Sequence, residues 1–307
     1  MRIIFFGTPD FAVASLRALA ESGHEIAAVV TAPDKPAGRG QQLSQSAVKQ
    51  FALEAGLPLL QPEKLKAPEF LETLRQLAAD LHVVVAFRML PEAVWAMPPL
   101  GTINVHASLL PQYRGAAPIN WAIINGEAFT GVTTFQLQHE IDTGGILLQN
   151  EIAILPQDDF GTLYQKLMEQ GAALLTETVQ ELAARTLVPK PQPQHPAGLK
   201  HAPKIFKADC ELDFTQTAEA VHNKVRGLSP FPTAFTMLDG KVLRIFKSRF
   251  QTIQEGHPLH KPGDYDTDGK SYLRFATPDG WLYAEELQLE GKKRMGVLEF
   301  LRGYRFA

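Results

Sequence analysis

Apolar positions along residues 1–187 follow two alternating periods. Largely apolar runs such as 2–6 and 81–86, interrupted only by Arg2 and His82, predict buried strands of a mostly parallel sheet. Between such runs, apolar residues recur at helical spacing, as at 68–79. This alternation predicts a Rossmann-like α/β domain, in which a mostly parallel sheet carries helices on both faces.

Local signals predict several element boundaries. Asp10 is expected to cap a helix over residues 11–22. Residues 32–43 contain two prolines, two glycines and two cations, which predicts a loop that is neither helix nor central strand. The helical pattern over 160–186 predicts one long helix, with Gly171 as the place for a break.

The composition changes after residue 187. Residues 188–205 contain five prolines and three lysines but no acid, which predicts an extended basic linker. From residue 206 to 307, short strand patterns separated by glycines accompany two short helical patterns. The sequence therefore predicts a second, smaller β-rich domain over 206–307.

Composition excludes several classes of protein. The net charge of −3 over 307 residues gives no global attraction to nucleic acid, so an anionic partner needs a local basic patch. With Cys210 as its one cysteine, the chain has no internal disulfide and no Cys-x-x-Cys zinc motif, which favours the reducing cytoplasm. No apolar run reaches about 18 residues, and the first apolar run is too short for a signal peptide. We therefore expect a cytoplasmic protein with no membrane segment and no metal.

The stretch 101–126 carries the first candidate chemistry. Asn104 and His106 lie two residues apart in a predicted strand, so both side chains leave the same face near its carboxyl end. A polar loop follows, and Pro118 opens a predicted helix. Open α/β sheets place their binding sites at such strand ends.

A second short stretch, Glu-Ile-Asp-Thr-Gly-Gly, places Asp142 in a glycine turn. An amide, an imidazole and a carboxylate together suit the attack of a neutral nucleophile on an acyl carbon. Each of the three is also a common structural residue in strands and turns. Spacing alone does not join Asp142 to Asn104.

The letters N-V-H-A-S-L-L-P-Q-Y-R-G-A-A-P-I-N-W-A-I-I-N-G, followed by I-D-T-G-G, resemble the signature of the folate-dependent formyltransferases. These enzymes pass a formyl group from 10-formyltetrahydrofolate to an amine. The resemblance implies that Asn104 and His106 bind the formyl oxygen and that Asp142 lies on the proton path. It also implies a set of folate-binding residues: Ser108, Leu109, Leu110 and Pro111.

A loop near the amino terminus, P-D-K-P-A-G-R-G, resembles the loop by which the formyltransferases of methionyl-tRNA enter the acceptor end of the tRNA. The resemblance implies that Arg39, supported by Lys35, binds initiator methionyl-tRNA. On composition alone a solvated linker has equal weight. Gln41 and Gln42 stand where the family often has cations, which predicts a smaller electrostatic contribution to tRNA binding.

The same resemblance extends to the carboxyl-terminal region, where it implies an OB-like domain that lines one side of a tRNA groove. One departure stands at Phe87-Arg88-Met89, where the family more often has a Tyr-Gly pair near the pterin. The chain is thus expected to be a monomer that formylates methionyl-tRNA. The alternatives are a formyltransferase of a small molecule and a non-catalytic RNA-binding protein with the same fold.

Two other patterns are rejected. Residues 264–269 resemble the start of a calcium loop, but Phe275 stands where the loop needs its final Glu. The glycine pattern after the first strand is not Gly-x-Gly-x-x-Gly, which argues against a nicotinamide enzyme.

Overall fold

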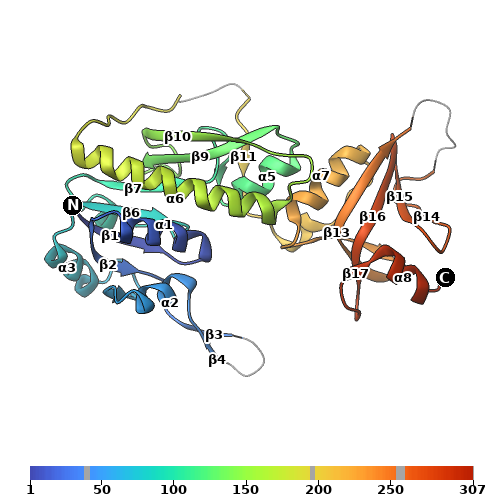
Figure 1. Cartoon of the computed structure of the whole chain (residues 1–307), viewed down its shortest axis with the longest axis horizontal. Helices are drawn as coiled ribbons and strands as arrows, with labels where there is room; N and C mark the ends of the chain where they lie inside the picture. The colour runs from blue at the N-terminus through green and yellow to red at the C-terminus, as the bar shows by residue number, and fades with distance from the viewer. Residues whose placement is uncertain (38–41, 194–197, 254–259, 307) are drawn as a thin grey trace. The chain divides into compact units, whose positions relative to one another are not determined.

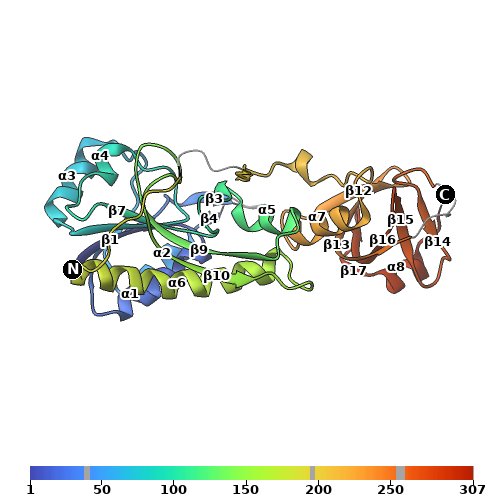
Figure 2. The ribbon, with the colours of Figure 1, turned by 90° about the horizontal axis from the view of Figure 1, so that it is seen from above.

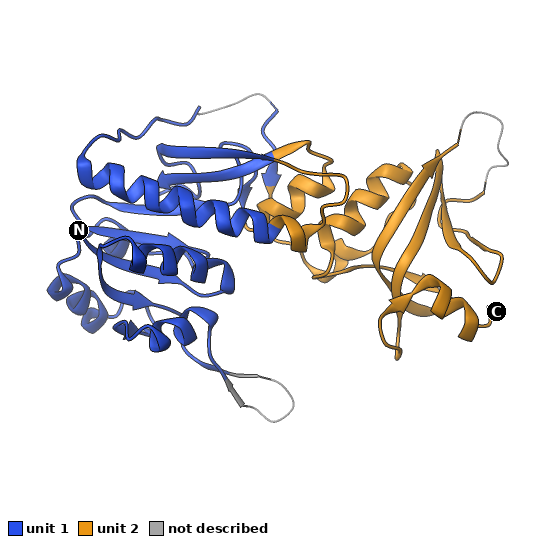
Figure 3. Ribbon diagram, in the orientation of Figure 1, with its two compact units in different colours: residues 1–115, 130–152, 164–201 blue, residues 116–129, 153–163, 202–307 orange. Residues whose placement is uncertain are grey.

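A computed structural model describes residues 1–37, 42–193, 198–253 and 260–306. The chain forms two compact units, shown in two colours in Figure 3, and each is described by itself. The first unit comprises 1–115, 130–152 and 164–201, and the second comprises 116–129, 153–163 and 202–307. The boundaries predicted at 187/188 and 205/206 stay predictions.

The first unit is built on one sheet with the strand order β10-β9-β7-β6-β1-β2-β5 (Figure 1). The strands β1, β2, β5, β6 and β7 pair in parallel, whereas β9 runs antiparallel to β7. The bounds are β1 (Arg2–Gly7), β2 (Glu25–Val30), β5 (Leu59–Leu60), β6 (Leu81–Val85), β7 (Thr102–His106), β9 (Phe129–Gln136) and β10 (Ile146–Ala153). The predicted mostly parallel sheet is confirmed.

Helices cover both faces of this sheet, as predicted. Figure 2 shows α3 and α4 on one face and α1 and α6 on the other. The bounds are α1 (Asp10–Glu21), α2 (Ala47–Glu54), α3 (Pro68–Leu77), α4 (Glu92–Trp95) and α6 (Phe160–Ala184). On the face of α3 and α4, Phe70, Leu74 and Val94 pack with Ile4 and Phe6 of β1. Strands buried on both faces explain why their sequences read as continuous apolar runs.

The structure tests three local predictions about the first unit. Asp10 does not cap α1, because Pro9 holds the N-cap position and Asp10 is the first helical residue. The predicted single long helix is confirmed as α6, which continues through Gly171 without a break. A Cβ atom at Gly171 would lie 3.1 Å from Cγ1 of Val105, so glycine permits close packing on β7. The predicted loop at 32–43 contains a two-stranded hairpin, β3 (Lys35–Ala37) and β4 (Gln42–Ser44).

The second unit contains an antiparallel sheet with the order β12-β13-β16-β15-β14, and β17 pairs with β16. Its bounds are β12 (Ala234–Leu238), β13 (Lys241–Thr252), β14 (Tyr265–Thr267), β15 (Leu273–Thr277), β16 (Gly280–Leu289) and β17 (Met295–Gly296). The helices of this unit are α5 (Pro118–Ile124), α7 (Ala218–Leu228) and α8 (Val297–Gly303), and a short 3₁₀ helix, η1, spans Lys207–Cys210. Two further short strands are β8 (Arg114–Gly115), which belongs to the first unit, and β11 (His201–Ala202). The predicted β-rich carboxyl-terminal domain is confirmed.

The core of the second unit joins α7 and α8 to one face of the sheet. Val221 and Val225 of α7 and Phe300 of α8 are buried with Phe275 and Leu282 of the sheet. Two strands, β14 and β17, were not predicted, because each is only two or three residues long. Among the described residues, no helix is both long and apolar enough to cross a membrane.

Candidate active site

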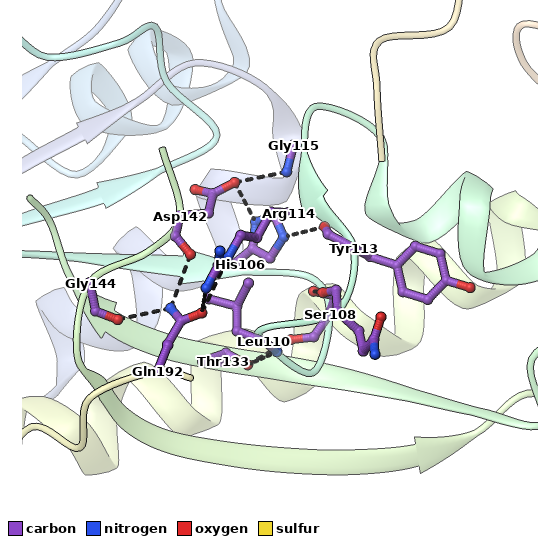
Figure 4. A network of polar contacts seen from close by, with 11 residues as sticks. His106, Ser108, Leu110, Tyr113, Arg114, Gly115, Thr133, Asp142, Gly144 and Gln192 are labelled. Atoms are coloured by element: carbon purple, nitrogen blue, oxygen red, sulfur yellow. Dashed lines mark hydrogen bonds and ion pairs between the residues drawn. The ribbon is translucent and has the colours of Figure 1, made fainter. Parts of the chain in front are cut away.

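The imidazole of His106 lies at the carboxyl end of β7, where its side chain is 7% exposed. Its Nε2 atom lies 2.9 Å from the carbonyl oxygen of Tyr113. Because a carbonyl oxygen only accepts, Nε2 must carry the hydrogen of this bond. The other ring nitrogen, Nδ1, is therefore the atom that points to the rest of the site (Figure 4).

The carboxylate that faces this nitrogen belongs to Asp142. Its Oδ2 atom lies 3.9 Å from His106 Nδ1 and accepts a hydrogen bond of 2.9 Å from the backbone N–H of Gly115. The backbone of Asp142 is left-handed, with φ of 56°, a conformation that Asp tolerates better than most residues. The structure thus brings together two predicted site residues that are far apart in the sequence.

The amide of Asn104 leaves β7 two residues before His106, so the two side chains share one face of the strand. The Oδ1 atom of Asn104 is buried and has no hydrogen-bond partner among the described residues. A buried amide oxygen without a hydrogen-bond partner costs the folded protein on the order of 1–3 kcal/mol of stability. A ligand that supplied a hydrogen bond at this place would recover that free energy.

The predicted folate loop follows β7 directly. Ser108 is buried, and its hydroxyl donates to the carbonyl of Gln112 at 2.7 Å. Leu110 is also buried, and its backbone N–H donates to the hydroxyl of Thr133. Leu109 and Pro111 are partly exposed. Any contact of this loop with folate therefore falls to its backbone and to Leu109 and Pro111, and the role itself stays a prediction.

One polar residue of the site was not predicted from the sequence. Gln192, in the segment expected to be a spacer, is buried with 8% exposure. Its Nε2 donates to the carbonyls of Asp142 at 3.0 Å and Gly144 at 2.8 Å, and its Oε1 accepts from Arg114 at 2.6 and 3.2 Å (Figure 4). A glutamine between prolines has no periodic signal, so the sequence offered nothing that separates it from a solvated residue.

Arg39, the main predicted tRNA-binding residue, lies outside the described residues. Lys35 is exposed at the start of β3. Next to it, Asp34 binds the ammonium of Lys49 at 2.5 Å and the amide of Gln61 at 2.9 Å. The hydrogen bond from Lys49 lowers the pKa of the Asp34 carboxyl below its ordinary value. This ion pair fixes the base of the hairpin to α2.

The departure at Phe87-Arg88-Met89 is held by backbone oxygens of another loop. The guanidinium of Arg88 donates to the carbonyls of Pro62 and Glu63. Phe87 meets the ring of Phe6 edge-on, with centroids 5.8 Å apart. Arg88 is thus not merely solvated, because it joins two loops at the edge of the sheet.

Among the residues that the structure describes, no three His, Cys, Asp or Glu side chains gather as metal ligands. In the rejected calcium-like segment, the Asp268 carboxylate accepts hydrogen bonds from Ser271 and Lys270 of its own turn. These hydrogen bonds lower the pKa of Asp268 below its usual range, and the bond from the Ser271 side chain has the largest effect.

Comparison with known sequences gives consistent relatives. Residues 1–179 match the family described as formyl transferase, and residues 204–305 match the formyl transferase C-terminal domain. The chain is 53% identical over 314 residues to a methionyl-tRNA formyltransferase of Parabacteroides distasonis, covering 99% of this chain and 96% of that one. A protein of the same name from Porphyromonas gingivalis is 49% identical over 313 residues, with coverage of 99% and 96%.

Solved structures share the fold at low sequence identity. HypX from Aquifex aeolicus, in complex with tetrahydrofolic acid, matches with a TM-score of 0.64 and 21% identity; the match covers all of this chain, which spans 48% of that longer one. An N-formyltransferase from Helicobacter canadensis, in complex with folinic acid and dTDP-3-aminofucose, matches with a TM-score of 0.66 and 18% identity over 92% of this chain and 98% of that one. These likenesses concern the fold.

Proposed function

The chain belongs to the formyl transferase family, and on that premise we propose that it transfers the formyl group of 10-formyltetrahydrofolate to the α-amine of methionyl initiator tRNA. The product is N-formylmethionyl-tRNA for the initiation of translation. The observation that supports the chemistry most directly is the meeting of the His106 imidazole and the Asp142 carboxylate at 3.9 Å. They meet at the end of the strand that also carries the unpartnered Asn104 oxygen.

In the proposed reaction, the neutral α-amine attacks the formyl carbon of the folate substrate. Attack forms the new C–N bond and a tetrahedral intermediate with a negatively charged oxygen. The bond from the formyl carbon to N10 then breaks, and the proton lost by the amine ends on N10. Asn104 donates a hydrogen bond from its amide nitrogen to the developing oxyanion. Asp142 accepts the proton of the attacking amine and relays it.

His106 contributes the second donor of the oxyanion site. Its Nε2–H is engaged with the carbonyl of Tyr113, so Nδ1–H of the protonated ring is the group that can reach the formyl oxygen. The distance of 3.9 Å to Asp142 is too long for a direct hydrogen bond, which leaves room for this donation.

One assay tests the function. The purified chain is incubated with initiator methionyl-tRNA and 10-formyltetrahydrofolate, and N-formylmethionyl-tRNA is quantified. We expect turnover by the wild type and a loss on the order of 100- to 1,000-fold for Asn104→Ala, since one oxyanion donor is removed. Asp142→Ala is expected to fold and be nearly inactive. Wild-type turnover by both variants contradicts the mechanism, and transfer only to a nucleotide-linked amino sugar contradicts the acceptor.

The proposal extends to the tRNA-binding residues. Arg39 and Lys35 supply positive charge on the loop that resembles the one which enters the acceptor end of the tRNA, and arginine suits contacts to phosphate and bases. Arg39→Ala is expected to raise KM for the tRNA and leave KM for the folate unchanged. Equal effects on both substrates contradict this role.

We also propose that the enzyme is a monomer and that it acts in the cytoplasm. Light scattering after size-exclusion chromatography tests the first part. A mass near twice 33.9 kDa contradicts it.

A further inference from the structure

We propose that Gln192 is a positioning residue for the reaction, through which the segment after α6 holds the Asp142 carboxylate in its working place. The inference rests on the proposed function. It assigns a role in catalysis to a buried residue whose amide nitrogen and oxygen both bind other parts of the protein.

The two ends of the Gln192 amide have fixed identities. One end faces two carbonyl oxygens, those of Asp142 and Gly144, at 3.0 and 2.8 Å. The other end faces the guanidinium of Arg114 at 2.6 and 3.2 Å. Carbonyls only accept and guanidinium only donates, so the nitrogen must point to the turn and the oxygen to Arg114. All four hydrogen bonds depend on this one amide.

Other hydrogen bonds to the backbone of the turn that Gln192 binds lie on either side of Asp142: the Thr143 hydroxyl donates to the carbonyl of Glu140, and the backbone N–H of Gln136 donates to the carbonyl of Gly145. Asp142 adopts a left-handed backbone, a conformation that is uncommon for residues other than glycine and that neighbouring contacts must hold. Ile141, directly before it, is 60% exposed and therefore contributes little packing. The amide of Gln192 binds the turn on both sides of Thr143, so it opposes rotation of the segment that carries the carboxylate.

Arg114 links this amide back to the catalytic groups. Its two neighbours along the chain, Tyr113 and Gly115, bind His106 and Asp142 through backbone atoms at 2.9 Å each. The tripeptide thus orients the imidazole with one carbonyl and the carboxylate with one N–H. Gln192 ties the backbone of Asp142 to the same tripeptide, so the carboxylate and its partners are placed as one unit.

Misplacement of a catalytic group by about 1 Å lowers rates on the order of 100-fold. Gln192→Met keeps the length of the side chain and removes both polar ends, so we expect kcat to fall about 10- to 100-fold. We expect KM for the folate and for the tRNA to change less than about threefold, because both ends of the Gln192 amide bind protein groups. Gln192→Glu keeps the acceptor for Arg114 and loses the donor to the turn, so a similar fall in kcat is expected.

A double-mutant cycle separates positioning from a general structural effect. Arg114→Met is expected to lower kcat several-fold, and Arg114→Lys less, since its ammonium still donates to the Gln192 oxygen. The losses of Arg114→Met and Gln192→Met are expected to be non-additive in the double variant, because the two residues form one chain of contacts. Val188→Ala, at a 75% exposed position of the same segment, is the matched control and should keep wild-type kinetics.

The outcomes are distinct. Failure of the wild type to formylate methionyl-tRNA refutes the proposed function. An active wild type with wild-type kcat in Gln192→Glu and Gln192→Met refutes the positioning role alone. A rise in KM for the tRNA with unchanged kcat also refutes it, because Gln192 would then act in binding. If neither Gln192 variant folds, equal kcat of Arg114→Lys and Arg114→Met refutes the proposal, and a higher kcat of Arg114→Lys supports it.

Discussion

Gly144→Ala is the change for which the structure gives the clearest magnitude. A Cβ atom added to Gly144 would lie 1.7 Å from the backbone carbonyl oxygen of Gln136. Real Cβ atoms do not approach closer than 3.0 Å, so the turn must shift by about 1.3 Å. The obstacle is backbone of β9, inside a sheet, which cannot rotate away as a side chain would.

The shift acts on catalysis through Asp142, two residues earlier. Its carboxylate accepts from the Gly115 N–H at 2.9 Å, and a displacement of about 1 Å takes this bond beyond hydrogen-bonding range. The carbonyl of Gly144 also loses its place opposite Gln192. We therefore expect kcat to fall on the order of 100-fold and stability by about 1–3 kcal/mol.

The assay compares initial rates at saturating methionyl-tRNA and 10-formyltetrahydrofolate with thermal unfolding of the same samples. Gly303→Ala in α8, where an added Cβ meets nothing within 4 Å, controls for the loss of a glycine. A Gly144→Ala enzyme with kcat within threefold of wild type refutes the reasoning about the turn. A variant that unfolds below the assay temperature supports the clash, and Asp142→Asn then tests the carboxylate in an unshifted turn.

Two further predictions concern other parts of the first unit. Burial lowers the pKa of His82 to about 4, so the unfolded chain, with a histidine pKa of about 6.5, binds more protons between these values. The free energy of unfolding should thus fall by roughly 3 kcal/mol as the pH drops from about 6.5 to 4. Melting measured across this pH range should show a smaller fall for His82→Gln. His139→Gln is the control, because that side chain is 73% exposed, and it should match the wild type. Lys49→Met leaves Asp34 without its ion-pair partner at the base of the hairpin, so KM for the tRNA should rise several-fold. Lys64→Met, at an exposed position, is the control. Equal KM for the tRNA in both variants contradicts a role of this ion pair in tRNA binding.

The sequence by itself determined the layers of the fold. Runs such as Ile3 to Phe6 are apolar at every position, and only a strand buried on both faces needs that pattern. Amphipathic segments such as Pro68–Leu77 predicted helices because one face must meet the sheet. These patterns report local burial, which each segment encodes in its own residues.

The sequence did not predict several short elements, because they contain too few residues to show a periodic pattern of apolar positions. The hairpin Lys35–Ala37 with Gln42–Ser44 contains proline and too few residues for alternation to appear. Asp10 looked like an N-cap, yet in the fold its carboxylate accepts from the hydroxyl of Tyr164, more than 150 residues away. A capping preference of about 1 kcal/mol is easily outweighed by such a tertiary contact.

Only the tertiary structure decided how the candidate site is assembled. The sequence placed Asn104 and His106 on one strand face, but it gave no distance to Asp142 and no reason to single out Gln192. That amide joins its own segment to two others, through the backbone of Asp142 and Gly144 in one turn and the side chain of Arg114 in another loop. Every residue has a backbone carbonyl, so the sequence does not indicate which carbonyls a side chain will bind. Only the tertiary fold determines which side chain lies close enough to bind them.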